Sequence, residues 1–232
     1  MPGLLAATLV MSALAPGCGR ETPGQSPPGA AGRPSRQGEP PATAAGPRVV
    51  FLGDSLTTGY GLAAGEAYPS LVQQRLRDAG LAAEVVNAGV SGDTSAGGLR
   101  RLDWALDGDV AVLVVALGGN DALRGLSTDD LRRNLAAIIE RARGRGVTVV
   151  LAGMEAPPNL GKVYTSAFRQ VYRDLAAEHH VALIPFLLEG VAGRPGLNQA
   201  DLIHPNAEGA RKVADLVWPF VERAVREAAH HD

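Results

Sequence analysis

The chain has 232 residues, of which 46% are apolar, and a formal net charge of -2. This length and apolar content fit one domain with a single buried core, and the near-neutral charge gives no reason to expect a nucleic-acid partner. The single cysteine excludes a disulfide inside the folded part, so packing must stabilise it. A monomer is the default expectation.

The first eighteen residues, MPGLLAATLVMSALAPGC, form an apolar stretch with the length of a signal-peptide core and too few residues to span a bilayer. The segment LAPGC resembles the lipobox of bacterial lipoproteins, which implies acylation of Cys18, although Pro16 and the lack of a preceding Lys or Arg depart from that pattern. A plain secretory signal, or a tail without a targeting role, is the alternative. We expect an exported bacterial protein, either periplasmic or anchored to a membrane as a lipoprotein through Cys18.

Residues 19–47 are dominated by Gly, Pro, Ala and Ser and show no apolar periodicity. Such a composition cannot bury enough apolar surface to fold, so this segment is predicted to be a disordered linker. The expected organisation is a signal segment over residues 1–18, the linker over 19–47 and one folded domain over 48–232.

From residue 48 onward, short β-branched apolar runs alternate with helical patterns. The runs are VVFL at 49–52, EVVNA at 84–88, VAVLVVAL at 110–117, VTVVL at 147–151 and VALIP at 181–185. They are continuous rather than alternating, as expected for strands buried on both faces of a parallel sheet. We predict a three-layer α/β/α sandwich around a five-stranded parallel sheet.

Apolar residues at helical spacing predict the helices between these strands, with one around residues 68–76 and one around residues 131–139. Ser127 and Asp130 form a candidate capping pair in front of the second of these helices. Two more helices are expected at RQVYRDLAAEH and over residues 207–228, where Pro219 should kink or interrupt the helix.

In sheets of this kind, ligands bind beyond the carboxyl ends of the strands. The segment FLGDSLTTGYG places Ser55 at the end of the first predicted strand, where a serine is either a turn or cap residue or a nucleophile. NAGVSGDTSAGG, GGND and MEAPPNLGK follow the next three strands, and DLIHPNAEG precedes the last helix. All of these segments should converge on one edge of the sheet.

A serine nucleophile needs a base within hydrogen-bond reach and a group that fixes the tautomer of that base. Four of the five histidines form adjacent pairs on polar stretches, where a solvated role is the simplest interpretation. His204 differs because Asp201 precedes it by three residues, so one turn can carry both side chains on the same side. Taken alone, this Asp-x-x-His pattern is more typical of a surface capping pair.

Acyl transfer also needs hydrogen-bond donors directed at the oxyanion. The candidates are the backbone N–H groups of Ser55 and Gly92 and the side-chain amide of Asn120. A tight turn at Gly92 and a helix start at Asn120 are the structural alternatives. Their joint placement with His204 at one predicted edge favours catalysis.

The segments GDSLTTGYG, SGDTS, GGND and DLIHPN resemble the four ordered blocks of the SGNH (GDSL) hydrolases, with the characteristic residues at Ser55, Gly92, Asn120 and His204. The resemblance extends over about residues 47–225 and is greatest to the bacterial subgroup of thioesterase I, lysophospholipase L1 and arylesterase. It implies a flavodoxin-like fold and a triad of Ser55, Asp201 and His204. It also implies an oxyanion hole of Ser55, Gly92 and Asn120, and neither a metal nor a cofactor.

The same resemblance implies a serine esterase that hydrolyses carboxylic esters and thioesters through an acyl-enzyme, with broad specificity for small-molecule or lipid esters. The loop EAPPNLGKVY corresponds to the acyl groove, where apolar contacts favour an acyl chain over a sugar. The candidate contacts are Ala156, Pro157, Pro158 and Leu160, and the structural alternative is a crossover that the prolines stiffen.

Two other functions fit the same scaffold, a carbohydrate O-deacetylase and a non-catalytic domain that binds lipid or glycan. The non-catalytic domain is the less favoured of these, because all five candidate positions carry the residues that catalysis needs, namely Ser55, Gly92, Asn120, Asp201 and His204. Asp54, next to the candidate nucleophile, is expected to have a structural role, in which it hydrogen-bonds the backbone around the turn.

Overall fold

The structure is a computed structural model that describes residues 46–229. The expected signal segment, the candidate lipidation site Cys18 and nearly all of the predicted linker lie outside these residues, as do His230 and His231. Within the described part of the chain, no helix combines the length and the apolar character needed to cross a bilayer.

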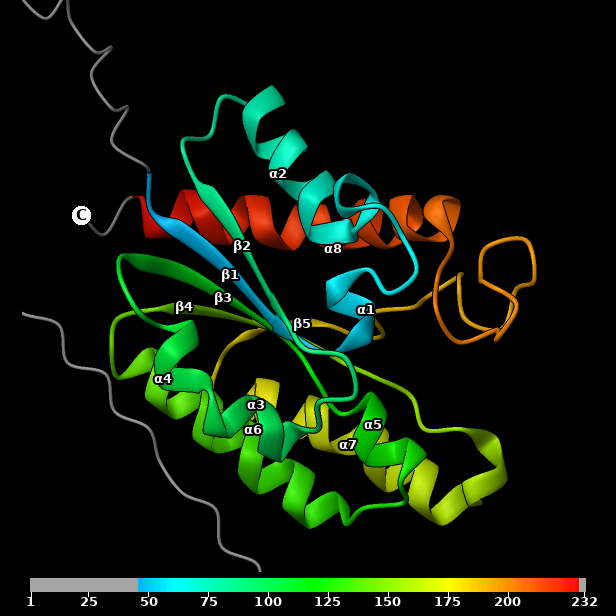
Figure 1. Ribbon diagram of the computed structural model, residues 1–232. Coiled ribbons are helices and arrows are strands. Elements are labelled where there is room, and N and C mark those ends of the chain that lie inside the picture. The colour runs from blue at the N-terminus through cyan, green and yellow to red at the C-terminus, as the bar shows by residue number, and fades with distance from the viewer. Residues whose placement is uncertain (1–45, 230–232) are drawn as a thin grey trace, which may run out of the picture. The chain divides into compact units, whose positions relative to one another are not determined.

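Five parallel strands form one sheet in the order β2-β1-β3-β4-β5 (Figure 1). They are β1 (Arg48–Gly53), β2 (Glu84–Gly89), β3 (Val110–Ala116), β4 (Thr148–Ala152) and β5 (Ala182–Ile184). Each strand coincides with a predicted apolar run to within one residue at either end. Gly53 pairs with Gly89 on one side and Ala116 on the other, so the first three strands end level with one another.

Helices cover both faces of the sheet, which confirms the predicted three-layer architecture (Figure 1). One face carries α2 (Tyr68–Asp78) and α8 (Ala207–Ala228). The other carries α3 (Ser95–Arg100), α4 (Leu102–Ala105), α6 (Thr128–Arg143) and α7 (Lys162–Glu178). The connections contain the short helices α1 (Ser55–Thr58) and α5 (Gly119–Leu123) and two 3-10 turns, η1 (Ala64–Glu66) and η2 (Pro158–Leu160).

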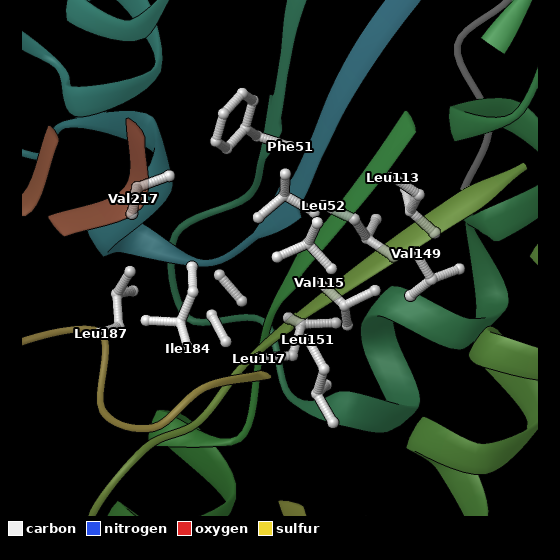
Figure 2. Close-up of a cluster of buried hydrophobic side chains, with 14 of the residues drawn as sticks. Phe51, Leu52, Leu113, Val115, Leu117, Val149, Leu151, Ile184, Leu187 and Val217 are labelled. Atoms are coloured by element: carbon white, nitrogen blue, oxygen red, sulfur yellow. The ribbon is translucent and has the colours of Figure 1, made fainter. Parts of the chain in front are cut away.

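The continuous apolar runs produce a sheet whose middle is buried on both faces. In β1, β3 and β4 every residue after the first one or two is buried, whereas the edge strands β2 and β5 are partly exposed. Figure 2 shows side chains of the central strands, such as Leu52, Val115 and Leu151, packed in one cluster that also contains Val217 of α8. This dense core gives the loops at the strand ends a rigid base.

The last helix, α8, runs through Pro219 without a break, so of the two predicted effects, a kink or an interruption, the interruption does not occur. A proline removes one hydrogen bond from a helix, but tertiary packing supplies most of a helix's stability. Val217 and Val221, which flank the proline, are both fully buried. Packing of this face against the sheet therefore outweighs the local effect of the proline.

The predicted capping pair in front of α6 forms only in part. The Ser127 hydroxyl accepts a hydrogen bond from the backbone N–H of Asp129 at 3.2 Å, so the serine is the N-cap as expected. The Asp130 carboxylate instead accepts from Arg133, one turn further along. An ion pair on the helix surface thus replaces the second half of the capping pair.

Candidate active site

A cavity of about 600 Å³ lies beyond the carboxyl ends of the strands and brings together Ser55, Gly92, Asn120 and His204. The rest of its lining is mainly apolar and includes Leu56, Leu123, Met154, Ala156, Pro157, Pro158, Phe186, Leu188, Leu202 and Ile203. Within residues 46–229, no three His, Cys, Asp or Glu side chains form a group that could hold a metal ion. The cavity therefore combines one polar wall with a larger apolar surface.

Ser55 is the first residue after a sharp turn from β1 into α1. Gly53 permits this turn, because a Cβ atom there would lie only 2.0 Å from Thr57 Oγ1. Asp54 is the N-cap of α1, and its Oδ1 accepts from the backbone N–H of Leu56 at 3.0 Å, which is the backbone bond expected for this side chain. As the first helical residue, Ser55 keeps a backbone N–H without an intrahelical acceptor, next to its own hydroxyl.

The structure brings Ser55, His204 and Asp201 into one hydrogen-bonded row. His204 Nε2 lies 2.8 Å from Ser55 Oγ, and His204 Nδ1 lies 2.6 Å from Asp201 Oδ2. Asp201 Oδ1 accepts from the backbone N–H groups of Ile203 at 2.9 Å and His204 at 3.0 Å, so the segment folds back as its spacing predicts. These bonds, led by the one from the His204 ring, lower the pKa of Asp201 to about 2. When Nδ1 carries the proton, Nε2 is free to accept from the Ser55 hydroxyl.

Two residues that the sequence did not single out also support His204, one through its ring and one through its backbone. The Tyr60 ring packs against it with ring centroids 4.8 Å apart. The Gln199 side-chain amide donates to the carbonyls of Tyr60 at 2.6 Å and Pro205 at 3.0 Å, and its backbone N–H donates to the His204 carbonyl at 2.8 Å. Gln199 therefore joins the segment after α1 to the segment that carries the histidine.

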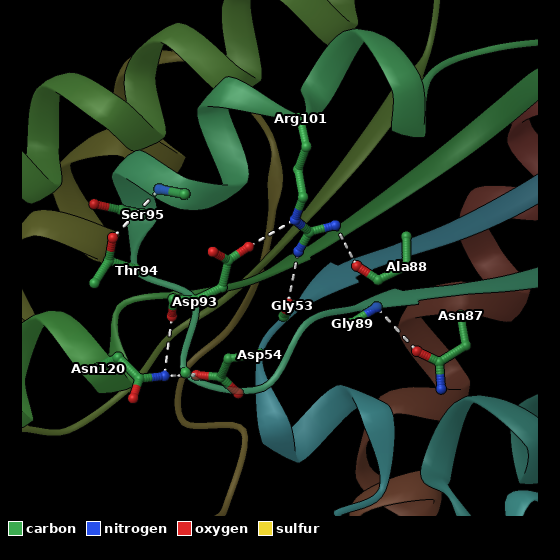
Figure 3. A network of polar contacts seen from close by, with 12 residues as sticks. Gly53, Asp54, Asn87, Ala88, Gly89, Asp93, Thr94, Ser95, Arg101 and Asn120 are labelled. Atoms are coloured by element: carbon green, nitrogen blue, oxygen red, sulfur yellow. Dashed lines mark hydrogen bonds and ion pairs between the residues drawn. The ribbon is translucent and has the colours of Figure 1, made fainter. Parts of the chain in front are cut away.

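Gly92 lies in the segment between β2 and α3, and Asn120 is the second residue of α5. Gly92 has φ +80°, a left-handed conformation that favours glycine, and no hydrogen bond among residues 46–229 uses its N–H. Asn120 Nδ2 donates to the Asp93 carbonyl at 2.9 Å and to Asp54 Oδ2 at 3.2 Å (Figure 3). Its amide group is thus fixed at the cavity wall, with an acceptor already present for each hydrogen.

Asp54 is 3% exposed, and burial raises the pKa of its carboxyl from 3.8 to about 6. The hydrogen bond from Leu56, the charge of His204 and the hydrogen bond from Asn120 each oppose this rise. The contact with Asn120 was not predicted from the sequence. It gives Asp54 a direct link to the cavity wall in addition to its capping bond.

Three of the four predicted substrate contacts line the cavity, and one does not. Ala156, Pro157 and Pro158 line the cavity, whereas Leu160, at the end of η2, does not. Phe186 and Leu188 were missed, although they follow β5 and the strand-end rule would have found them. The contact of Tyr60 with His204 gave no sequence signal, because it depends on how the chain turns after α1.

Comparison with known proteins relates the whole region that carries these residues to one family. Residues 51–212 match the GDSL-like Lipase/Acylhydrolase family. Esterase TesA of Pseudomonas aeruginosa is 45% identical over 180 residues, which cover 77% of this chain and 90% of that protein. The thioesterase 1/protease 1/lysophospholipase L1 of Escherichia coli is 35% identical over 190 residues, which cover 82% of this chain and 88% of that protein.

Solved structures show the same relationship. The crystal structure of TesA superposes with a TM-score of 0.74 at 43% identity, over 76% of this chain and 99% of its own. The SGNH-hydrolase family esterase AlinE4 superposes with a TM-score of 0.65 at 44% identity, over 77% of this chain and 96% of its own. Both the predicted fold and the predicted ester-hydrolysing class are thereby confirmed. The chain belongs to the GDSL-like Lipase/Acylhydrolase family.

Proposed function

We propose that this protein is a serine esterase in which Ser55 is the nucleophile, His204 the general base and acid, and Asp201 the residue that orients the imidazole. The observation that carries this assignment is the row of contacts at 2.8 Å and 2.6 Å that links Asp201 to His204 and His204 to Ser55, of which the last two line the cavity. Because its pKa is lowered to about 2, Asp201 stays ionised at neutral pH and stabilises the imidazolium without taking up its proton.

In the first half of the reaction, Ser55 Oγ attacks the acyl carbonyl carbon while His204 Nε2 takes the hydroxyl proton. The tetrahedral oxyanion accepts hydrogen bonds from the N–H groups of Ser55 and Gly92 and from the Asn120 amide. The Asn120 hydrogen that forms the longer bond, at 3.2 Å to Asp54 Oδ2, is the one donated to the oxyanion, so that it is shared between the two oxygens. His204 then protonates the leaving alcohol or thiol, and an acyl-enzyme remains.

In the second half, water attacks the acyl-enzyme as His204 takes its proton, and collapse of the intermediate returns that proton to Ser55 and releases the acid. The same three donors stabilise this second oxyanion. No further group is required, because every proton moves between the substrate, water, Ser55 and His204.

The substrate class that fits is an ester or thioester with an apolar acyl chain, such as an aryl ester, an acyl thioester or a lysophospholipid. The mainly apolar lining after β3, β4 and β5 supports an acyl chain over the acetylated sugar of a carbohydrate O-deacetylase. The name lysophospholipase L1, which the Escherichia coli relative carries, points to the same class of substrate. A cavity of about 600 Å³ is wide enough for varied acyl groups, which supports broad specificity.

The test is hydrolysis of p-nitrophenyl esters from acetate to palmitate by the purified protein, with Ser55→Ala in parallel. We expect turnover that Ser55→Ala abolishes and that rises with chain length, by about fourfold at most for each methylene that the cavity buries. Turnover of acetate alone would favour the deacetylase. No serine-dependent turnover of any ester would overturn the proposal and leave a lipid- or glycan-binding domain.

We also propose that residues 48–232 form the catalytic domain of an exported protein, which residues 19–47 link to a signal segment ending at Cys18. The support is the composition of the two N-terminal segments. Acylation of Cys18 would hold the enzyme near lipid substrates. Incorporation of labelled palmitate that is lost in Cys18→Ala is the expected result, and equal labelling of both proteins would contradict the tether.

A further inference from the structure

Arg101, directly after α3, forms hydrogen bonds with residues next to the polar wall of the cavity. Its side chain is 17% exposed, and all three guanidinium nitrogens donate hydrogen bonds (Figure 3). Nε donates to Asp93 Oδ2 at 2.6 Å, Nη1 to the Ala88 carbonyl at 2.5 Å and Nη2 to the Gly53 carbonyl at 2.8 Å. One planar group thus contacts the end of β1, the end of β2 and the loop that follows β2.

Two of these three acceptors belong to residues within two positions of a proposed oxyanion donor, whereas Ala88 lies four residues before Gly92. Gly53 precedes Ser55 by two residues, and Asp93 directly follows Gly92. The Asp93 backbone carbonyl in turn accepts from the Asn120 amide at 2.9 Å. The three donors belong to α1, to the segment between β2 and α3, and to α5. Arg101 and Asp93 reach them through the Gly53 carbonyl, through the neighbouring Gly92 and through the Asn120 amide.

On the basis of the oxyanion donors assigned above, we propose that Arg101 is a positioning residue that sets the relative placement of Ser55 N–H, Gly92 N–H and the Asn120 amide. Such donors stabilise the developing charge only when they converge on one oxygen at about 2.7–3.1 Å. A displacement of about 1 Å in an active site can cost about 100-fold in rate. Arg101 acts through the backbone and Asp93 and does not touch the substrate.

The geometry requires an arginine. A guanidinium presents its donors in a fixed planar fork, whereas a lysine ammonium is a single flexible point charge that cannot keep the same three directions. The Asp93 carboxylate is 14% exposed and is confined from the other side by Gly97, where a Cβ atom would lie 1.9 Å from Asp93 Oδ1. Gly97→Ala would therefore displace Asp93 while leaving the arginine intact.

The experiment compares Arg101→Lys and Gly97→Ala with the wild type and with Arg75→Lys as the matched control. Arg75 is also partly buried, and it binds the carbonyl of Ala214 and the carboxylate of Asp215, but it joins α2 to α8 away from the cavity. Active sites are counted by complete reaction with a fluorophosphonate, so that misfolded protein does not lower the measured kcat. The readouts are kcat and KM on a p-nitrophenyl ester and the Ki of an alkyl boronic acid.

The boronic acid reports directly on the oxyanion donors. When it binds, Ser55 Oγ bonds to boron, the hydroxyl proton passes to His204, and the boron becomes tetrahedral with one oxygen in the oxyanion position. In Arg101→Lys and Gly97→Ala we expect kcat per titrated site to fall by about 10- to 100-fold, KM to change by less than about threefold, and Ki to rise by the same factor as kcat/KM falls. Arg75→Lys should leave all three values within about twofold of the wild type.

A purely structural role for Arg101 predicts a lower melting temperature with kcat per titrated site and Ki unchanged, and that result would overturn the proposal. Loss of kcat without weaker boronic-acid binding would also overturn it, because the damage would then lie outside the oxyanion hole. If Arg101→Lys does not fold, the kcat per titrated site and the boronic-acid Ki of Gly97→Ala test the proposal on their own. Full turnover by Ser55→Ala would instead refute the proposed function itself, whatever the Arg101 variants do.

Discussion

Two carboxyl groups of the candidate site have pKa values that move in opposite directions because their surroundings differ. Asp201 is partly exposed and accepts hydrogen bonds from the His204 ring and from two backbone N–H groups, which lower its pKa to about 2. Asp54 is buried, and loss of water raises its pKa to about 6. The charge on Asp201 is therefore constant above about pH 4, whereas the charge on Asp54 changes in mildly acidic solution.

The pKa of Asp54 predicts how its contribution to stability depends on pH. The pKa of Asp54 is about 6 in the folded protein and 3.8 as its ordinary value, so between about pH 4 and pH 6 the folded state holds a proton on Asp54 that the unfolded state has lost. The free energy of unfolding should then fall as pH rises from about 4 to about 6, by up to about 3 kcal/mol. Asp54→Asn should remove this fall, as measured by urea unfolding across that range. Equal slopes in both proteins would show that Asp54 does not titrate as stated.

Asp201→Asn tests the orienting role of the carboxylate. An asparagine can donate to the imidazole and so favours the wrong tautomer, and we expect kcat to fall by about 10³- to 10⁴-fold. The unfolding free energy should change little, because the side chain is partly exposed. Asp215→Asn, which removes the carboxylate of the Arg75 ion pair, is the matched control and should retain full activity. A loss below about tenfold in Asp201→Asn would exclude this role.

Among the elements, the turn between β3 and α5 depends on one glycine and one tyrosine. Gly118 has φ +113°, and Tyr172 of α7 donates from its hydroxyl to the Leu117 carbonyl at 2.9 Å. A Cβ atom at Gly118 would lie 2.0 Å from the Tyr172 hydroxyl oxygen. The contact therefore fixes α7 against the turn that carries Asn120.

Gly118→Ala should destabilise the protein by at least about 2 kcal/mol, since it combines the close contact with an unfavourable φ. Tyr172→Phe alone should cost about 1–2 kcal/mol, because the buried Leu117 carbonyl loses its donor. In the double variant the clash with the hydroxyl is absent, so its cost should be smaller than the sum of the two. Urea unfolding measures all three, with Gly65→Ala as control because nothing lies within 4 Å of a Cβ atom there. Strict additivity would contradict the contact.

At the scale of the whole molecule, the sequence predicted the three layers, and the resemblance to a known family pointed to Ser55, Asp201 and His204, whose side chains the structure places within hydrogen-bond distance. The strands could be predicted because burial on both faces demands continuous apolar runs, and the position of the cavity because parallel strands end at one edge. The contacts of Arg101 and the pairing of Asp54 with Asn120 could not be predicted. They join residues from different loops, and they depend on the register of β1, β2 and β3, which no local pattern encodes.

The three residues Ser55, Asp201 and His204 follow strands that differ in how firmly the sheet holds them. Ser55 follows the interior strand β1, whereas Asp201 and His204 lie after β5, an edge strand of three residues that pairs only with β4. Local opening should be easier at such an edge than in the middle of the sheet. We therefore expect the urea concentration at which half the activity is lost to be lower than the concentration at which half the far-UV circular dichroism signal is lost. Coincident transitions would show that both parts unfold as one unit.

The cavity wall has a consequence for how members of such a family diverge. Ala156, Pro157 and Pro158 line the cavity, yet they belong to a loop that contributes none of the groups proposed to move a proton or bind the oxyanion. A change of length or sequence there alters the room for the acyl group while the reacting atoms keep their supports. Substrate specificity can thus change through this one connection between β4 and α7 without loss of turnover. It is therefore the segment to replace when an enzyme with a different substrate is to be engineered.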